Sequence, residues 1–132
     1  VVVGNAQTDT LTIGAHVKLT GADPTITATP VGTYPAAGTT PTVGIGWAND
    51  TAGEIDITTG AGPTAGALCE IAFATARPDN NYAVFLQPRT SGGVLLGWRA
   101  TSRTSAGFVV TVATAPGAAT DIGFFYLVLA GG

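Results

Sequence analysis

Apolar and polar side chains alternate along much of the chain, and segment 121–130 shows a distinctive version of this pattern. Alternate side chains of a strand point to opposite faces of a sheet. The two rows of this strand are Ile122, Phe124, Tyr126 and Val128 on one face, and Phe125, Leu127 and Leu129 on the other. Because both rows are apolar, the strand is expected either to lie between two layers or to be half buried in a subunit interface.

The same alternation predicts further strands in the middle of the chain. In segment 54–58, two isoleucines point inward and two carboxylates, Glu54 and Asp56, point outward. The other predicted strands are 43–47, 67–75, 82–87, 94–100 and 107–114. Segment 67–75 also fits a helical stripe, but Gly66 precedes it where a helix would need a cap, and every neighbouring segment is a strand.

Strands of about six residues, repeating at roughly ten to fifteen residues, are typical of an antiparallel β-sandwich or jelly roll. We therefore expect an all-β, jelly-roll-like head domain over residues 42–132. Its loops are expected at 77–81, 89–93 and 101–105. Its inward side chains are expected to be Ile55, Ile57, Ile71, Phe73, Val84, Leu86, Phe108 and Val110. These side chains can cover only one of the two apolar rows of the strand 121–130. The row of Phe125, Leu127 and Leu129, or the opposite row, is therefore expected to be covered in part by a neighbouring subunit.

Residues 1–41 have little hydrophobic mass and form a separate predicted segment. Short strands are expected at 1–3, 10–13, 15–19 and 25–29, followed by a linker rich in proline and glycine at 31–41. Short strands cannot bury a core alone. The segment is therefore predicted to be an N-terminal arm, or part of a shaft in which several chains supply each other's missing neighbours.

Composition narrows the partners that can be expected. Charged residues make up 10% of the chain, against about 25% in an average domain, which predicts a part packed into a larger assembly. The formal net charge is -3 with five basic residues, which argues against nucleic acid, because phosphate contacts need clustered lysine or arginine. No window approaches the ~18 unbroken apolar residues that a membrane helix needs, so no membrane insertion is expected.

Catalytic groups are sparse. The single histidine, His16, would have to meet a serine across the chain to form a triad, and nothing in the sequence supports that meeting. The serines that could complete such a triad are Ser91, Ser102 and Ser105. Glu54 and Asp56 could pair as glycosidase carboxylates, but two solvated charges on an outward strand face explain them better. We therefore expect no enzymatic activity.

No metal or cofactor site is expected either. Cys69 is the single cysteine and lies in an apolar run, so it is interpreted as a small buried hydrophobe. Segment 79–81 has oxygen ligands suited to calcium, but aspartate and asparagine in a turn need no metal. The glycines lack the order of a phosphate-binding loop.

Carbohydrate binding remains a candidate function. Sugars stack on aromatic faces, and the aromatic candidates are Trp47, Tyr82 and Trp98, with core packing as the alternative use of each. The residues expected to contact a glycan are Asp79, Asn80, Asn81, Tyr82, Trp98, Arg99 and Arg103.

From residue 49 onward, the chain resembles the C-terminal domains of tail-fibre and other surface proteins of tailed bacteriophages. The segments that carry the resemblance are 49–68, 71–76, 82–88, 106–116 and 124–128. Their order is D-T-A-G, a strand, a glycine-rich turn, a strand, an apolar strand ending in proline, a G-F-x-V-x-V strand and a terminal F-x-Y-x-V. The polar stretch 99–105 departs from this pattern.

The resemblance implies a β-sandwich, usually homotrimeric, on the outside of a virion. It suggests a non-enzymatic adhesion module, the distal domain of a tail fibre or receptor-binding protein. The subunit contact would involve Phe125, Leu127 and Leu129, the N-terminal arm would bind other virion proteins, and the loops would face a host glycan. The alternatives are a capsid decoration or head-fibre protein that stabilises the shell, and, less favoured, a tail-associated enzyme that degrades glycans.

Overall fold

The computed structural model describes residues 19–29, 31–90 and 95–130. Within these ranges every regular element is a strand, which agrees with the all-β prediction. The strands predicted at 1–3 and 10–13, most of the one at 15–19, and the residues His16 and Ser91 lie outside the described residues.

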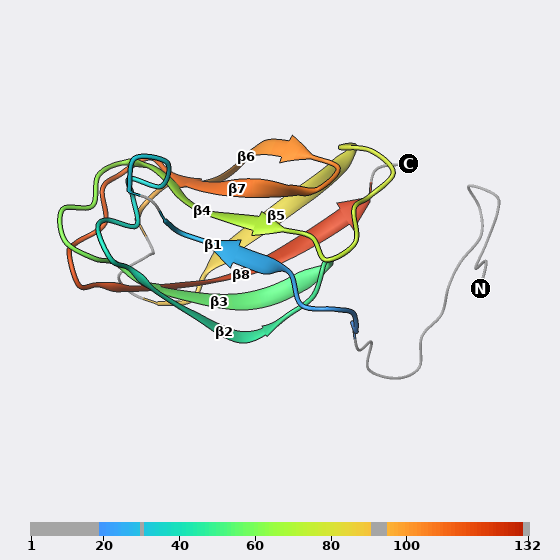
Figure 1. Ribbon diagram of the computed structural model, residues 1–132, viewed down its shortest axis with the longest axis horizontal. Helices are drawn as coiled ribbons and strands as arrows, with labels where there is room; N and C mark the ends of the chain where they lie inside the picture. The colour runs from blue at the N-terminus through green and yellow to red at the C-terminus, as the bar shows by residue number, and fades with distance from the viewer. Residues whose placement is uncertain (1–18, 30, 91–94, 131–132) are drawn as a thin grey trace.

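In the described residues, eight strands form two sheets. They are β1 (Thr25–Thr27), β2 (Thr42–Ala48), β3 (Ala52–Thr58), β4 (Gly66–Ala72), β5 (Tyr82–Pro88), β6 (Trp98–Thr104), β7 (Gly107–Val112) and β8 (Asp121–Ala130). One sheet has the order β1-β4-β7-β6 and the other β2-β3-β8-β5, and all pairs are antiparallel. The two sheets stack face to face (Figure 1), so the predicted antiparallel sandwich is confirmed at this level.

Strand β8 occupies a central place in its sheet, between β3 and β5. Its inner row, Ile122, Phe124, Tyr126 and Val128, is buried against the opposite sheet. Its outer row is not: Phe125 is 37% exposed and Leu129 is 48% exposed in the isolated chain. One apolar row is therefore covered by the sandwich and the other is left without cover from the described residues.

The core between the sheets contains the side chains that alternation placed there. Ile55, Ile57, Ile71, Phe73, Phe108 and Val110 are buried, and Val84 and Leu86 pack against them. Aromatic rings join the two layers. Phe108 on β7 meets Tyr126 on β8 at a centroid distance of 6.0 Å, and Trp98 lies 5.2 Å from Phe124. The ambiguous segment around Cys69 is strand β4, as the pattern of its neighbours predicted.

The prediction for β6 was wrong in position. The strand runs from Trp98 to Thr104 rather than over 94–100, so most of the segment expected as a loop at 101–105 is strand. Threonine is β-branched and favours extended backbone, and Thr101 pairs with Val109 and Thr104 with Gly107. The segment reads as polar because β6 is at the edge of its sheet, where the outward side chains face water.

The described part of segment 19–41 also differs from the expected separate arm. Strand β1 pairs with β4, with Ile26 opposite Ile71. Farther along, Tyr34 and the alanines at 36 and 37 are buried in the core. Small alanines fill narrow gaps at the end of the sandwich, which explains why a segment of low hydrophobic mass still belongs to it.

Candidate functional site

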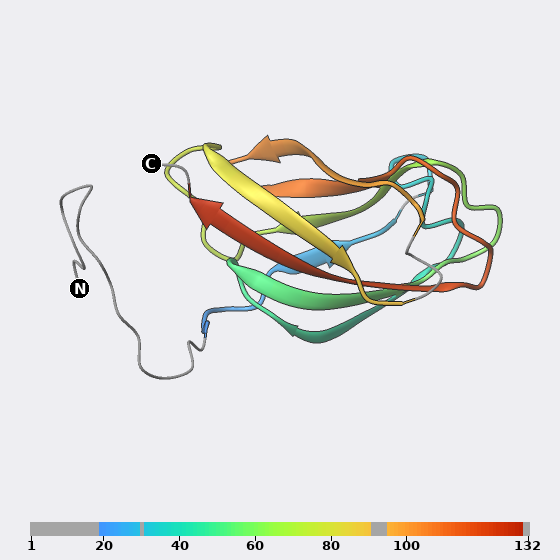
Figure 2. The same cartoon turned by 180° about the vertical axis from the view of Figure 1, so that it is seen from behind.

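The outer surface of sheet β2-β3-β8-β5 carries a cluster of apolar side chains. We call it the apolar outer face and define it as Trp47, Phe85, Phe125, Leu127 and Leu129. Register places these side chains together: Phe85 pairs with Leu127, and Trp47 and Phe125 are each opposite Glu54. Phe85 is 57% exposed and Trp47 is 48% exposed. Figure 2 views the molecule from the side of this sheet.

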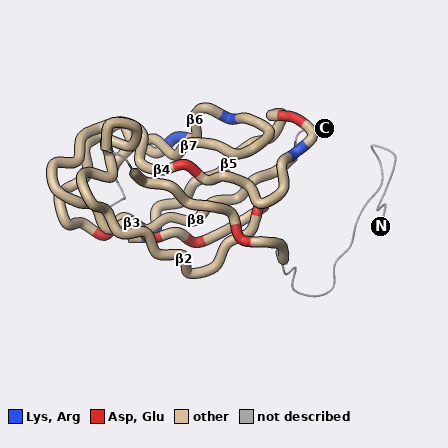
Figure 3. The backbone as a smooth tube through the Cα atoms, in the orientation of Figure 1, with Lys and Arg blue, Asp and Glu red and all other residues tan. Residues whose placement is uncertain are grey.

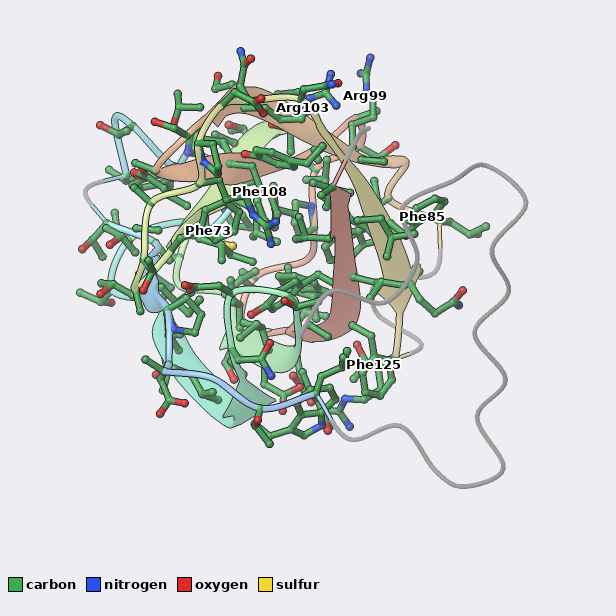
Figure 4. The ribbon with its side chains drawn as sticks, turned by 90° about the vertical axis from the view of Figure 1, so that its right-hand side faces the viewer. Phe73, Phe85, Arg99, Arg103, Phe108 and Phe125 are labelled. Carbon is green, nitrogen blue, oxygen red and sulfur yellow. The ribbon has the colours of Figure 1, made fainter. Side chains whose placement is uncertain are left out.

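The side-chain view shows how the two kinds of phenylalanine are disposed. Phe85 and Phe125 project from the outside of the β5–β8 sheet, whereas Phe73 and Phe108 lie between the sheets (Figure 4). On β5, Val84 and Leu86 take the inward positions, so Phe85 must point outward. The backbone alternation that builds the core therefore also fixes the aromatic surface.

Three charged side chains lie beside the apolar outer face and bind one another. Arg89 Nε is 3.1 Å from Glu54 Oε1, and its Nη2 donates to Asp56 Oδ1. The group lies over Gly123, where an added Cβ would collide with both Asp56 and Arg89. The hydrogen bond to Asp56, together with the negative charge of both carboxylates, raises the pKa of the Arg89 guanidinium. The two predicted outward carboxylates are thus held in ion pairs at this surface.

The outer surface of the opposite sheet has a different character. Register puts Thr27, Glu70, Val109 and Thr101 in one row across it. Thr101 Oγ1 lies 2.8 Å from the hydroxyl oxygen of Thr111, so threonines there bond to each other. Figure 3 shows that charged positions are few and scattered over the described chain. The sandwich therefore has one apolar and one threonine-rich outer surface.

Of the residues expected to contact a glycan, Tyr82 is in the interior. Its ring packs against Phe73, and its hydroxyl lies 2.6 Å from the carbonyl oxygen of Gly107 and 2.9 Å from that of Thr104. Arg103 is exposed but donates from Nη1 to the Tyr82 carbonyl oxygen at 2.5 Å. Tyr82 therefore ties β5 to the β6–β7 turn and presents no open ring face.

The remaining members lie in two places: the 79–81 turn is next to Tyr82 and Arg103, and Trp98 and Arg99 are at the start of β6. Trp98 stacks inward on Phe124 at the start of β6, while Arg99 beside it is exposed. Asp79 Oδ1 accepts a hydrogen bond from the backbone amide of Asn81 at 2.8 Å, which is the self-contained turn that the sequence suggested. Arg103 lies near the other end of β6 from Trp98, about 17 Å away at the rise of an extended strand. The structure does not bring the seven residues into one site.

The groups considered for catalysis or metal binding are also apart. Among the described residues, no three histidine, cysteine, aspartate or glutamate side chains gather as metal ligands. Cys69 is fully buried, and this burial raises the pKa of its thiol. Ser102 and Ser105 are exposed at the end of the β6–β7 hairpin. In the part of the chain that the structure describes, no helix is long and apolar enough to cross a membrane.

Comparisons of the chain with protein-family models, with curated proteins and with solved structures find no match. The resemblance to phage surface proteins therefore rests on the sequence pattern alone. Of the features on the described surface, the apolar outer face is the best candidate for a binding site. Its β8 members were predicted from the sequence, whereas Phe85 and Trp47 were not placed there, although the alternation of Val84 and Leu86 pointed Phe85 outward.

Proposed function

We propose that this chain is a non-enzymatic structural and adhesion module on the surface of a bacteriophage virion, the distal domain of a tail fibre or receptor-binding protein. The observation that carries the proposal is the apolar outer face on a sandwich that is otherwise poor in charge. Contiguous exposed apolar surface of this kind marks a site of protein contact. The order of the motifs from residue 49 onward supplies the link to phage proteins.

The proposed assembly is a homotrimer of jelly-roll-like sandwiches. A chain with 10% charged residues has few groups to keep its whole surface in water. An assembly that buries one sheet face and exposes the threonine-rich one suits this composition, because threonine hydroxyls bond to water without adding charge. The contact residues include Phe125, Leu127 and Leu129.

The proposed host-facing surface lies at the exposed turns and the β6 edge. Asp79 and Asn80 are exposed in the turn before β5, and Arg99 and Arg103 are exposed on β6. These side chains have the amide, carboxylate and guanidinium groups that bond to sugar hydroxyls. A host surface glycan is therefore the proposed ligand, held by polar contacts around the turns and strand edge.

Locating the chain on particles tests the proposal. Gold-labelled antibody against the purified chain should mark the tail tip of the phage in electron micrographs. Labelling spread over the capsid would replace the tail-fibre reading with that of a decoration protein. Release of reducing ends from host surface polysaccharide by the purified chain would overturn the non-enzymatic assignment.

A further inference from the structure

Four side chains of the apolar outer face form one continuous patch. Phe85 and Leu127 are direct cross-strand neighbours, and Phe125 and Leu129 are two positions to either side of Leu127 on the same strand face. Strands are spaced by about 4.8 Å and alternate side chains by about 6.8 Å. The four side chains therefore touch or nearly touch, and Trp47 extends the patch across Glu54 to the edge strand β2.

The size of the patch is that of an interface. A fully exposed aromatic side chain offers about 150–250 Å². Scaled by the exposed fractions of Trp47, Phe85, Phe125 and Leu129, with a smaller part from Leu127, the patch presents roughly 400 Å² of apolar surface. Covered by an equal area of a neighbouring copy, the patch buries about 800 Å² in all, and the residues around it bring the contact near the ~1,000 Å² expected of a specific interface.

The charged side chains of this sheet face lie away from the centre of the patch at Leu127. Glu54, Asp56 and Arg89 bind one another, and Asp121 lies at the start of the outer row of β8. A partner can therefore cover the aromatic and aliphatic side chains without burying an unpaired charge, which would be costly. A sugar ligand would need polar groups among the rings, but the centre of this patch around Leu127 is aliphatic.

We infer that the apolar outer face packs against another copy of this chain, with the β5 and β8 side chains at the centre of the contact and the Arg89 ion pairs near its margin. This inference names the contact surface of the proposed homotrimer, and the number of copies rests on that proposed function. The choice of this face as the contact rests on its exposed apolar side chains. Figure 4 shows two of the central residues, Phe85 and Phe125, on this side of the molecule.

The test compares a double substitution on the face with a matched control elsewhere. The double variant Phe85→Lys with Leu129→Lys changes two exposed side chains, so the fold should tolerate it. The control, Leu95→Lys, changes a leucine that is 88% exposed in the connection between β5 and β6 and lies outside the face. Light scattering after size exclusion gives the mass of each full-length protein, and thermal unfolding followed by circular dichroism shows that each is folded.

The wild-type chain and the Leu95→Lys control should both have masses above the monomer mass of 13.1 kDa at micromolar concentration. The double variant should run as a monomer, with its dissociation constant raised about 100-fold or more. If it fails to fold, the pair Phe85→Ser and Leu129→Ser takes its place.

A wild-type monomer at about 100 micromolar would overturn both the homotrimer and this assignment. An oligomer that the face substitutions leave intact would overturn the assignment of the face and keep the oligomer. Neither result bears on where the chain lies on a virion, which the labelling experiment decides.

Discussion

The buried hydroxyl of Tyr126 joins distant parts of the backbone. Tyr126, on β8, donates to the carbonyl oxygen of Asn49 in the β2–β3 turn, and Asn49 Oδ1 in turn accepts from the amides of Thr51 and Ala52 at 2.8 and 3.0 Å. The same turn has other long-range bonds: Asn49 Nδ2 donates to the Leu19 carbonyl oxygen at 3.2 Å, and the amide of Val128 donates to the Thr51 carbonyl oxygen at 2.7 Å. The Tyr126 contact is buried, so water does not readily replace it.

Replacing Tyr126 with phenylalanine should lower the free energy of unfolding by about 1 to 2 kcal/mol, because the Asn49 carbonyl loses a buried donor. Urea unfolding followed by tryptophan fluorescence measures the change. Phe73→Leu is a useful comparison, since it alters the same core without removing a hydrogen bond. An unfolding free energy unchanged within 0.3 kcal/mol, about the error of such measurements, would show that the hydroxyl does not anchor the turn.

Tyr34 makes the stability of the fold sensitive to high pH. Burial, and then the hydrogen bond from its hydroxyl to Glu70 Oε2 at 2.8 Å, raise the pKa of Tyr34 from 10.0 to about 12. Since this pKa is raised in the folded state, the stabilisation is complete below pH 10 and is lost as the pH rises toward 12. The loss of unfolding free energy should amount to roughly 3 kcal/mol at most.

Urea unfolding at about pH 9, 10, 11 and 12 measures this loss of unfolding free energy. The variant Tyr34→Phe cannot ionise at this position, so its unfolding free energy should fall less over the same range. Tyr82, Tyr126 and Cys69 also have raised pKa values and contribute to the remaining slope. Identical pH dependence in the variant and the wild type would rule out Tyr34 as a contributor.

At the scale of elements, the hairpin between β6 and β7 depends on a glycine. Gly107 has a φ of 153°, and a Cβ added there would collide with the carbonyl oxygen of Ile71 on β4. Gly62 is a matched control: its φ is 63°, but nothing lies within 4 Å of an added Cβ. Comparing substitutions at the two positions therefore separates two costs: the collision of a side chain with a neighbouring strand, and the strain of a side chain at a positive φ.

The substitution Gly107→Ala should cost about 3 kcal/mol or more, because β4 and β7 must move apart. Gly62→Ala should cost only about 1 to 2 kcal/mol, the usual penalty for a left-handed residue with a side chain. Denaturant midpoints of the two variants and the wild type give the comparison. Equal costs at the two sites would contradict the close approach of β4 to Gly107.

Alternation predicted most of the elements because it depends on local sequence alone. Ile55 and Ile57 identified β3, and the two rows of β8 were separated correctly. Polar edge strands were harder, since Thr101 and Arg103 on β6 have no apolar partner row to reveal them. The choice between Trp47 and Trp98 was also beyond the local pattern: one ring faces outward and the other stacks on Phe124 because of where the second sheet lies. For the same reason, the expected glycan contacts could not be placed from the sequence.

At the scale of the molecule, the described segment 19–41 is built into the sandwich. The amide of Ala36 donates to the Ala67 carbonyl oxygen at 2.9 Å, and the amide of Gly60 donates to the Ala37 carbonyl oxygen at 2.8 Å. These bonds link the segment before β2 both to β4 and to the turn after β3. A linker that could move independently would not make such bonds with both sheets.

Hydrogen exchange should therefore report a single cooperative unit. The amide of Ala36 is hydrogen-bonded and its side chain is fully buried, so it should exchange at a rate within about tenfold of core amides on β8, such as that of Phe124. NMR measurements of exchange at single residues test this. If the amide of Ala36 exchanged more than about a hundredfold faster than that of Phe124, the segment would open on its own, and the head domain would begin near residue 42 as the composition of the chain suggested.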